Sequence, residues 1–339
     1  MKCKQILFTD KNKAELVTVD VNEPADNEVM VETMVSTISN GTKRANIMGD
    51  PNVNAGGESK VVFPRALGYS SAGIVVKKGS AVKSVDVGDR VVVYLGYHKS
   101  YNTVSEEQVV KIQDASISFE TGAMSFISTF PMAAIRKTRL EMGESAIVMG
   151  LGILGMIAVK LLRTAGAVPV IAADPNPKRR ELALKNGADY AFDPLCEDFA
   201  DEVKKVTGGG VNVAIEVTGV GAGFNEVLDC MSKFGRVALL GCTRNSDFTV
   251  DYYRKIHFPG ITVIGAHTMA RPNVESHPGW FTHRDDIMAV LKLCGGGRLN
   301  LEDIIEETHS PEECMEVYNR LIFDKNFPVA VQFDWRRLA

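Results

Sequence analysis

The chain has 339 residues, which exceeds the size of one ordinary hydrophobic core and predicts two domains. Hydrophobic residues make up 45% and charged residues 24% of it, a balance that excludes a disordered chain. The formal net charge of −4 comes from interspersed acids and bases, without a basic stretch for phosphate backbones or anionic lipid. We therefore expect neither a nucleic-acid partner nor a membrane partner.

The residues up to Asp10 lack the apolar core of a secretion signal, so we expect a cytoplasmic protein. The longest apolar run, 146–162, contains glycines and Lys160 and is not typical of a membrane span. The cysteines are scattered, with no CxxC pair, as expected of buried reduced thiols in a cytosolic protein. Neither disulfides nor a four-cysteine zinc site is predicted.

From residue 1 to about 118, short runs of β-branched residues alternate with turn residues, which is typical of an all-β unit. Strands are predicted at 29–35, 72–77 and 90–94, and Gly88 and Asp89 form a turn just before the last of these. We expect this half to be a mostly β, partly open barrel.

After residue 118, apolar strands alternate with helical stretches, which indicates a parallel sheet with crossover helices. Six strands are predicted, at 146–149, 168–174, 189–192, 213–218, 236–241 and 261–266, followed by a helix at 283–294 that Gly295 to Gly297 end. The final strand, 329–333, is expected to return to the first domain. The predicted fold is α/β, with a doubly wound Rossmann domain at 119–297 and a catalytic domain made of 1–118 and 298–339.

Gly150, Gly152 and Gly155 form a GxGxxG sequence between the first of these strands and a helix, the context that a dinucleotide fingerprint requires. Gly150 permits a tight turn, Gly152 lets the backbone approach a pyrophosphate, and Gly155 lets helix and strand pack closely. The backbone N–H groups at the helix start, at Ile153 and Leu154, favour a phosphate there. Glycine-rich turns also serve as plain connections, and the strand and helix on either side favour the cofactor role.

Asp174 ends the second strand, where an acid accepts hydrogen bonds from the adenosine ribose of NAD and repels the 2′-phosphate of NADP. NAD is therefore the predicted cofactor. Lys178, Arg179 and Arg180 follow and partly offset that repulsion, although a solvated helix face is their simplest role. The alternative role of Asp174 is a helix N-cap ahead of Pro175.

Three further residues, Thr218, Gly241 and His267, end later strands of the predicted sheet. Ligands bind at the carboxyl ends of strands in such sheets, so we expect all three near the cofactor, with His267 on its nicotinamide side. His267, His277 and His283 match no zinc-ligand spacing, and we expect loop and helix-cap roles for them. Trp280 and Trp335 have no predicted role beyond packing or an interface.

The chain resembles the medium-chain dehydrogenase/reductase superfamily over nearly its whole length. The resemblance rests on the barrel-like first half, on segments 67–75, 87–91 and 217–219, and on the glycine fingerprint. Within the family the chain is similar to the polyol and threonine dehydrogenase branch. That branch includes zinc-less members similar to bacteriochlorophyllide dehydrogenases, whose Ser-x-Gly-Thr segment resembles 39–42. The resemblance implies a chaperonin-10-like barrel and a homodimer or homotetramer, and the exposed edge of the predicted strand 261–266 supports the latter.

Departures from the family pattern fall at its zinc ligands. The family has a Cys before Gly-Thr or Gly-Ser, and here Asn40 stands before Gly41. The family's Gly-His-Glu is replaced by Gly68-Tyr69-Ser70, and the short segment 95–104 has none of the cysteines of the structural zinc lobe. With thiolate and imidazole both missing, we expect no metal.

Without zinc, hydrogen-bond donors must stabilise the developing alkoxide, and the vacated positions indicate Thr42, Lys43, Tyr69 and His98 as candidate catalytic residues. Tyr69 is the expected proton donor, and an ammonium such as Lys43 would lower its pKa. Its alternative role is an aromatic side chain that fills the volume left by the missing metal. Thr42 matches the family's hydroxyl that contacts the reacting oxygen. His98 titrates in the useful range, unless it is merely an exposed loop residue.

The predicted function is an NAD-dependent secondary-alcohol dehydrogenase or ketone reductase. Its small-molecule substrate is, by resemblance, a polyol, sugar or cyclitol. One alternative is a zinc-less alkene or quinone reductase of the same superfamily, against which Asp174 argues. The other is a non-catalytic dinucleotide sensor that keeps the fold and has lost the chemistry.

Overall fold

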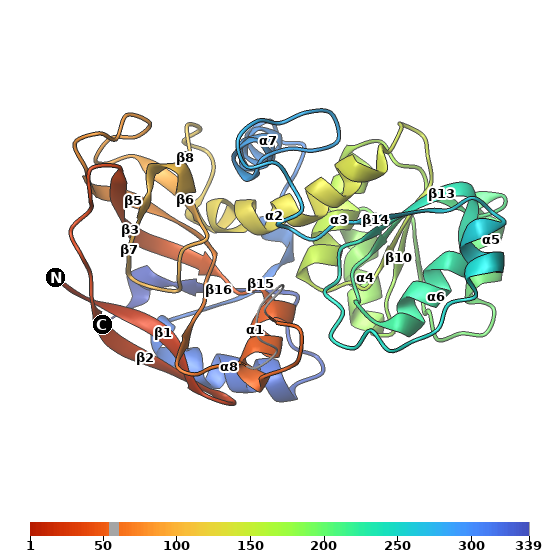
Figure 1. Cartoon of the computed structure of the whole chain (residues 1–339), viewed down its shortest axis with the longest axis horizontal. Coiled ribbons are helices and arrows are strands. Elements are labelled where there is room, and N and C mark those ends of the chain that lie inside the picture. The colour runs from red at the N-terminus through yellow and green to blue at the C-terminus, as the bar shows by residue number, and fades with distance from the viewer. Residues whose placement is uncertain (54–60, 339) are drawn as a thin grey trace. The chain divides into compact units, whose positions relative to one another are not determined.

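The computed structural model describes residues 1–53 and 61–338 and divides into two units (Figure 1). The first unit comprises Met1–Ile127 and Ile287–Ala339, and the second comprises Ser128–Asp286. Both boundaries fall inside helices, α2 (Phe119–Thr138) and α7 (His283–Gly295). The start of α2 belongs to the first unit because the hydroxyls of Thr37 and Ser70 donate to the Ala123 carbonyl at 2.9 and 2.6 Å.

The described residues of the first unit form two β-sheets. The smaller one has the strand order β2-β1-β4, and the larger one has the order β15-β16-β3-β5-β6-β8, with β7 also paired to β3. The bounds are β1 (Lys2–Asp10), β2 (Lys13–Asp20), β3 (Glu28–Thr37), β4 (Arg65–Ala66), β5 (Ser70–Lys78), β6 (Arg90–Tyr94), β7 (Tyr101–Ser105), β8 (Val109–Lys111), β15 (Ile305–His309) and β16 (Ala330–Asp334). The three strands predicted in this half lie within β3, β5 and β6.

Strand β3 is the centre of the larger sheet. It pairs antiparallel with β5, β7 and β16, and Gln332 of β16 lies opposite Thr37. The prediction that the last strand returns to the first domain is therefore confirmed. Inward-facing valines of β3, β5 and β6, among them Val31, Val75 and Val91, form a fully buried core.

In the part of the first unit that the structure describes, α1 (Asn40–Met48) and α8 (Cys314–Phe323) are the α-helices that lie wholly within it. Single 3₁₀ turns occur at Glu106–Gln108, Glu302–Ile304, Pro311–Glu313 and Trp335–Arg337. The expectation of an all-β unit up to residue 118 was wrong at α1, which ends at Gly49 in the left-handed conformation. Its buried residues include Lys43 and Asn46, so the segment lacks the apolar period that reveals an amphipathic helix.

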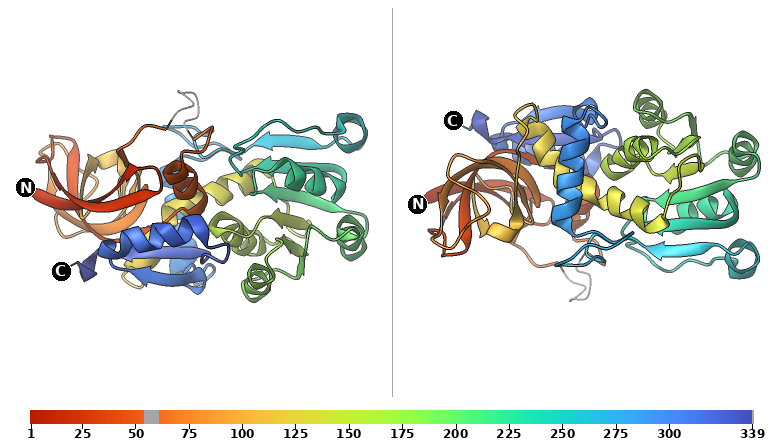
Figure 2. Two further views of the ribbon diagram at one scale, coloured as in Figure 1. Left: turned by 90° about the horizontal axis from the view of Figure 1, so that it is seen from below. Right: turned by 90° about the horizontal axis from the view of Figure 1, so that it is seen from above.

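The second unit is a six-stranded parallel sheet in the order β11-β10-β9-β12-β13-β14. The strands are β9 (Ala146–Met149), β10 (Val170–Ala173), β11 (Tyr190–Phe192), β12 (Val211–Glu216), β13 (Met231–Leu239) and β14 (Thr262–Gly265), and all six were predicted. The helices are α3 (Ile153–Thr164), α4 (Pro177–Lys185), α5 (Phe199–Thr207), α6 (Gly221–Asp229) and a π-helical turn at Tyr253–His257. Helices lie on both faces of the sheet (Figure 2), so the doubly wound fold is confirmed.

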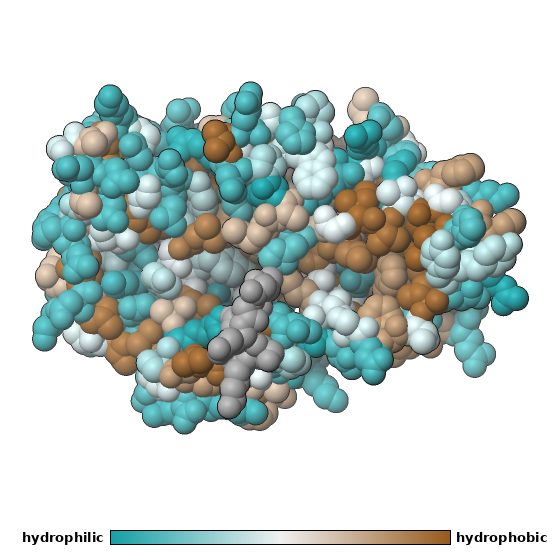
Figure 3. All heavy atoms as spheres, viewed as in Figure 1, coloured by the Kyte–Doolittle hydropathy of each residue, from teal (hydrophilic) through white to brown (hydrophobic). Residues whose placement is uncertain are grey.

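Strand β14 is an edge of this sheet and, among the described strands, pairs with β13 alone. Its Val263 is exposed, as are Phe234 and Phe258 of the adjoining segments. Figure 3 shows apolar side chains gathered over the place where Figure 1 labels β14.

Among the described residues, no helix combines the length and apolarity that a membrane crossing requires. All six cysteines are free thiols, but the expectation that they are buried was wrong for Cys196 and Cys242, which are exposed.

Candidate functional site

The glycine fingerprint occupies the turn between β9 and α3, and the tight turn at Gly150 and the close packing at Gly155 are as predicted. Gly150 adopts a φ of +95°, which the tight turn requires. A Cβ on Gly155 would lie 1.8 Å from the Gly150 carbonyl oxygen, so only glycine permits this close packing. A Cβ on Gly152 would meet nothing within 4 Å, which leaves open space beside the backbone there.

The start of α3 offers backbone donors to that space. Gly152 is the N-cap, and the first intrahelical bond runs from Met156 N to Gly152 O at 2.9 Å. The N–H groups of Ile153, Leu154 and Gly155 therefore have no intrahelical acceptor. Free donors, a helix N-terminus and open space beside Gly152 together fit a dinucleotide pyrophosphate.

Asp174 follows β10 directly and is nearly buried. Its Oδ2 accepts a hydrogen bond from Leu151 N and its Oδ1 accepts one from Asn176 N, both at 2.8 Å. The alternative role as the N-cap of α4 was wrong, because the Asn176 side chain caps that helix through Lys178 N. Each carboxylate oxygen keeps a second lone pair, so Asp174 can hold the glycine turn and still accept a ribose hydroxyl.

The basic residues after Asp174 differ from the solvated face expected of them. Lys178 is exposed, but Arg179 Nη1 lies 3.7 Å from Asp174 Oδ2. Arg180 Nη1 donates to the carbonyls of Asp174 and Pro175 at 2.7 and 2.9 Å and pairs with Asp193 at 3.1 Å. Arg180 thus binds backbone carbonyls and Asp193. Of the three basic residues, Arg179 is the one whose charge lies beside the Asp174 carboxylate.

The turn after β12 packs against the fingerprint and depends on a carboxylate that sequence reasoning missed, Glu216. Glu216 Oε1 accepts hydrogen bonds from Thr218 N at 2.7 Å and Gly219 N at 3.1 Å, and also from the Thr218 hydroxyl. Burial raises the pKa of Glu216, although these hydrogen bonds oppose the shift. Gly241 N donates to Glu216 O at 2.9 Å, and a Cβ on Gly241 would lie 2.4 Å from Gly219 N.

The structure therefore brings Gly150, Asp174, Thr218 and Gly241 to one edge of the parallel sheet, as predicted. They follow β9, β10, β12 and β13. Nothing in the residue type of Glu216 distinguished it from an ordinary strand acid. Its position two residues before the Thr218-Gly219 pair was the only available signal.

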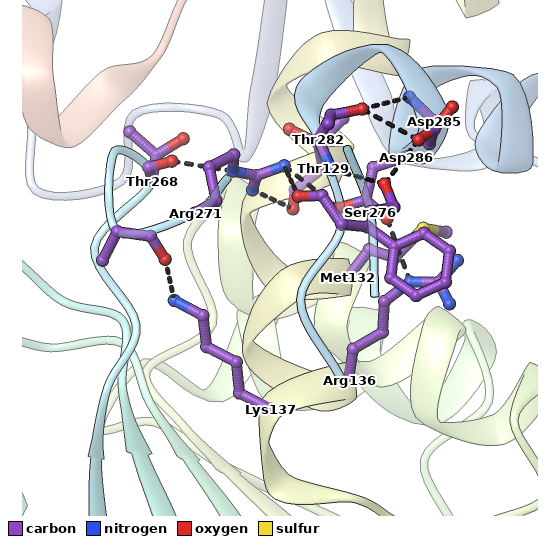
Figure 4. Close-up of polar contacts among 12 residues, drawn as sticks. Thr129, Met132, Arg136, Lys137, Thr268, Arg271, Ser276, Thr282, Asp285 and Asp286 are labelled. Carbon is purple, nitrogen blue, oxygen red and sulfur yellow. Dashed lines mark hydrogen bonds and ion pairs between the residues drawn. The ribbon is translucent and has the colours of Figure 1, made fainter. Parts of the chain in front are cut away.

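His267 lies after β14 on the same edge and is exposed, with Nδ1 accepting from Met269 N at 3.3 Å. Burial and the charge of Lys137 lower its pKa. Lys137 Nζ donates to the carbonyls of Ala270 and Gly265 at 2.6 and 3.3 Å, which ties this loop to α2 (Figure 4).

A buried ion-pair cluster holds the rest of the loop (Figure 4). Fully buried Asp286 pairs with Arg136 Nε at 2.9 Å and with Arg271 Nη1 at 3.0 Å. The Arg136 guanidinium also lies 3.8 Å from the centre of the Phe281 ring. With both arginines satisfied by one carboxylate, the loop that carries His267 has a defined position in the second unit.

The other two histidines of this region have structural positions, as expected. His283 is the first residue of α7, and burial and Arg271 lower its pKa to about 3. His277 pairs with Trp280 through two backbone hydrogen bonds of 2.8 Å. Across residues 1–53 and 61–338, no three His, Cys, Asp or Glu side chains are grouped so that they could hold a metal ion.

In the first unit, the four candidate catalytic residues come together around α1. Thr42 and Lys43 lie in the first turn of this helix, and Tyr69 precedes β5. The Tyr69 hydroxyl lies 3.5 Å from Thr42 Oγ1, and both side chains are half-buried. The Tyr69 ring packs edge-on against Phe126, with 5.7 Å between ring centres.

Lys43 is buried next to the Tyr69 ring. Its side chain is 0% exposed, and its Nζ lies 4.2 Å from the centre of the Tyr69 ring. No hydrogen-bond partner for Nζ is found among the described residues. Burial lowers the pKa of Lys43 to about 7, so the amine and ammonium forms are both populated near neutral pH.

His98 is also buried, so the alternative of an exposed loop residue was wrong. The cause is Gly68, whose φ of +133° and missing Cβ let the 96–98 segment fold over it: a Cβ there would lie 2.0 Å from His98 N. Burial, together with the Lys43 charge, lowers the pKa of His98 well below its ordinary value. The expectation that His98 titrates in the useful range was therefore wrong as well.

Asn40, which stands at the family's first ligand position, is engaged with the backbone. Its Nδ2 donates to the carbonyls of Pro328 and Val329, both at 2.9 Å. An amide at this position and the phenol of Tyr69 supply neither of the ligands, thiolate or imidazole, that zinc favours. The buried amine of Lys43 beside Tyr69 adds a positive charge when protonated, which opposes a dication.

Replacing Lys43 with the apolar residue methionine should stabilise the protein. The pKa shift from 10.5 to about 7 corresponds to on the order of 5 kcal/mol. This cost is complete below pH 7 and falls as the pH rises toward 10.5, because only the unfolded chain binds the proton in that interval. Denaturant unfolding of Lys43→Met should show a gain that is largest near pH 7 and shrinks with rising pH.

Lys83→Met, at an exposed position, is the matched control and should change stability little at any pH. A Lys43→Met variant that is no more stable than the unmodified protein, or whose gain does not vary with pH, would show that Lys43 is not a buried, strained amine.

Comparison with known proteins identifies the family of this chain. Two family models match, "Alcohol dehydrogenase GroES-like domain" over residues 25–137 and "Zinc-binding dehydrogenase" over residues 154–277. L-threonine 3-dehydrogenase of Pyrococcus horikoshii is 31% identical over 86% of this chain and 87% of its own. D-guloside 3-dehydrogenase of Escherichia coli is 27% identical over 92% of this chain and 95% of its own.

The fold is shared with solved structures. The crystal structure of 2R,3R-butanediol dehydrogenase from Bacillus subtilis superposes with a TM-score of 0.82 at 22% identity, over 98% of this chain and 99% of that one. The chain belongs to the medium-chain dehydrogenase/reductase superfamily and is an oxidoreductase of the alcohol dehydrogenase type.

Proposed function

We propose that this protein interconverts a secondary alcohol and a ketone with NAD(H), without a catalytic zinc ion. The observation that carries the proposal is the set of proton-bearing side chains on the first unit. In this set the half-buried hydroxyls of Tyr69 and Thr42 lie close together, and the buried amine of Lys43 lies over the Tyr69 ring. The relatives named above are dehydrogenases of L-threonine, a D-guloside and a butanediol. All three compounds carry secondary hydroxyls, which supports a polyol, sugar or cyclitol-like substrate.

Asp174 supports NAD as the cofactor. Its carboxylate is held at the end of β10 by two backbone N–H groups, so its charge is fixed where the adenosine ribose binds in this fold. A 2′-phosphate there would be repelled by a carboxylate whose orientation is fixed by these two hydrogen bonds. Arg179 only partly offsets that charge, at 3.7 Å.

The donor set supports a reaction without zinc. The family model described as zinc-binding matches residues 154–277, which do not include Asn40 or Tyr69. At those two positions the chain has an amide bound to backbone carbonyls and a phenol packed on Phe126. Acid–base chemistry must then come from the side chains themselves.

When bound, the nicotinamide supplies or accepts the hydride. During ketone reduction, the Tyr69 hydroxyl gives its proton to the oxygen that becomes the alcohol, and the Thr42 hydroxyl holds that oxygen by a hydrogen bond. Lys43, in its ammonium form, stabilises the negative charge left on the phenol oxygen through its position over the ring. Oxidation of the alcohol reverses these proton movements.

Replacement of Asp174 by alanine should weaken NADH binding. The lost charge-assisted hydrogen bonds are worth about 1.5–3 kcal/mol, or roughly 10- to 150-fold in Kd. Asp189→Ala is the matched control, because Asp189 accepts from Val170 N at the opposite end of the same strand, and it should leave the NADH Kd unchanged. Titration of the unmodified protein checks the premise: tighter binding of NADPH than of NADH would overturn the NAD assignment.

A panel of polyols, sugars and cyclitols with NAD, followed by NADH absorbance, tests the reaction, and Tyr69→Phe then tests its proton donor. We expect turnover on a member of the panel.

The Tyr69→Phe variant keeps the ring over which Lys43 lies and deletes the hydroxyl, so kcat should fall roughly 10²–10⁴-fold with little change in NADH affinity. Tyr101→Phe, which removes a phenol bound to Glu32, should keep its turnover.

Tight NADH binding with no turnover on any alcohol or ketone would favour a dinucleotide sensor. Turnover only of activated alkenes or quinones would favour the other reductase class. A Tyr69→Phe variant with normal kcat would reduce Tyr69 to the packing role.

We also propose that the protein forms homodimers or homotetramers through the β14 edge. Its unpaired backbone groups and the exposed Val263, Phe234 and Phe258 need cover. Light scattering after size-exclusion chromatography should give a mass of two or four chains, and Val263→Lys should shift it toward one. A monomeric mass at all micromolar concentrations would reject this assembly.

A further inference from the structure

The loop between β14 and α7 is held by a buried cation of helix α2, in the second unit. No helix or strand interrupts the described residues 266–282, so this loop is longer than the connections usual in a compact domain. Ordered loops of such length generally have a function. The loop starts beside the end of β13, because Ala266 N donates to the carbonyl of Leu239, the last residue of that strand, at 3.0 Å.

The ammonium of Lys137 joins separate parts of this loop (Figure 4). Its Nζ donates to the carbonyl of Gly265, at the end of β14, and to that of Ala270, at 3.3 and 2.6 Å. It also lies 4.5 Å from the centre of the Trp280 ring. An ammonium has three N–H donors, and two carbonyls and the face of an aromatic ring can receive all of them. The start, the middle and the end of the loop thus converge on one atom.

Burial makes Lys137 dependent on these contacts. The residue is 7% exposed, so its ammonium has little access to water and needs the carbonyls and the ring in place of hydration. Burial lowers the pKa of Lys137 to about 8; the charge of Arg271 adds to this shift, and the charge of Asp286 opposes it. The ammonium is therefore the main form near neutral pH.

The backbone that Lys137 binds includes the turn of His267. Ala270 N donates to His267 O at 2.9 Å, and Met269 N donates to His267 Nδ1 at 3.3 Å. The Ala270 carbonyl that Lys137 binds thus belongs to the residue that closes this turn. With Gly265 held as well, both ends of the segment 265–270 are fixed to helix α2.

The strand order indicates which part of a dinucleotide this segment would face. Asp174 follows β10 and the glycine fingerprint follows β9, whereas the segment 265–270 follows β13 and β14 at the other side of the sheet. Ligands bind at the carboxyl ends of strands in such sheets. With its adenosine at Asp174 and its pyrophosphate at the fingerprint, a dinucleotide extends its nicotinamide half toward β13 and β14.

We propose that Lys137 is a positioning residue of the cofactor site, whose ammonium holds the segment 265–270 where it receives the nicotinamide half of the dinucleotide. Lys137 acts through the loop and not by contact with the cofactor. The inference rests on the proposed function for the identity of the ligand. The hold on the loop rests only on the contacts of Lys137.

Binding of two ligands to Lys137→Met tests the positioning role. Methionine keeps an unbranched side chain and removes the N–H donors. The Kd for NADH should rise about 10-fold or more, the value of one charge-assisted hydrogen bond, whereas the Kd for ADP-ribose, which lacks the nicotinamide, should stay unchanged. General loosening of the second unit would weaken both ligands, so the difference between them separates positioning from a merely structural role.

Lys205→Met is the matched control. Lys205 is an exposed ammonium near the end of α5, ahead of β12 and so at the opposite edge of the sheet. Its replacement removes the same charge from the same unit and should leave both Kd values unchanged. Equal losses of affinity for NADH and ADP-ribose in Lys137→Met, or no loss for either, would overturn the positioning role.

Acrylamide quenching of tryptophan fluorescence tests the hold on the loop without any cofactor. In a Trp335→Phe background Trp280 is the sole tryptophan, and adding Lys137→Met should raise its quenching constant, whereas adding Lys205→Met should not. An unchanged quenching constant in Lys137→Met would overturn the hold on the loop. If the constant rises and the unmodified protein binds neither NADH nor ADP-ribose, the failure belongs to the proposed function, and the hold of Lys137 on the loop stands.

Discussion

The buried amine of Lys43 is the constraint on which the site in the first unit depends. Helix α1 places this side chain where water does not reach it. Among the described residues, the Tyr69 ring partly compensates the lost hydration of the ammonium through a cation–π contact of 4.2 Å. Such an arrangement costs stability that a methionine would not cost. Costs of this kind are retained in natural proteins chiefly where function requires them. Burial lowers the pKa of His98 and the Lys43 charge adds to that shift, and the same charge lies over the Tyr69 ring.

Two carboxylates have a corresponding role in the second unit. Asp174 directly follows β10 and Glu216 ends β12, and each accepts hydrogen bonds from the backbone of a glycine-containing turn. Their burial makes these hydrogen bonds stronger and the turns stiffer. The two turns at the proposed cofactor site are therefore preorganised, and Asp174 combines two tasks, since the residue proposed to favour NAD also anchors the fingerprint. Changing cofactor preference at this position would consequently disturb the glycine turn.

Much of the architecture could be predicted from the sequence. The apolar strands of the parallel sheet and the glycine fingerprint depend on local pattern, and local pattern survives in the fold. The proximity of Lys43 to Tyr69 was also predicted, because both positions follow motifs of a recognisable family. Helix α1 was not predicted, since it buries a lysine and an asparagine where an amphipathic pattern would have apolar residues.

The remaining features arise from contacts between distant segments. His98 is buried only because Gly68 allows the 96–98 segment to pack on it. The hydroxyl of its partner Ser36 also accepts from Trp335, which comes from the other end of the chain. The pairing of Arg271 with Asp286 likewise depends on how the loop after β14 folds back. Residue types show that such groups need partners, but they do not show which partners the fold supplies.

The central claim is that this member of a family described as zinc-binding carries out its reaction with its own side chains. Metal analysis of the purified, active protein, combined with activity before and after chelation, tests it most directly. The account predicts no stoichiometric zinc and activity that survives chelation. One zinc ion per chain, with activity lost on chelation and restored by zinc, would contradict it.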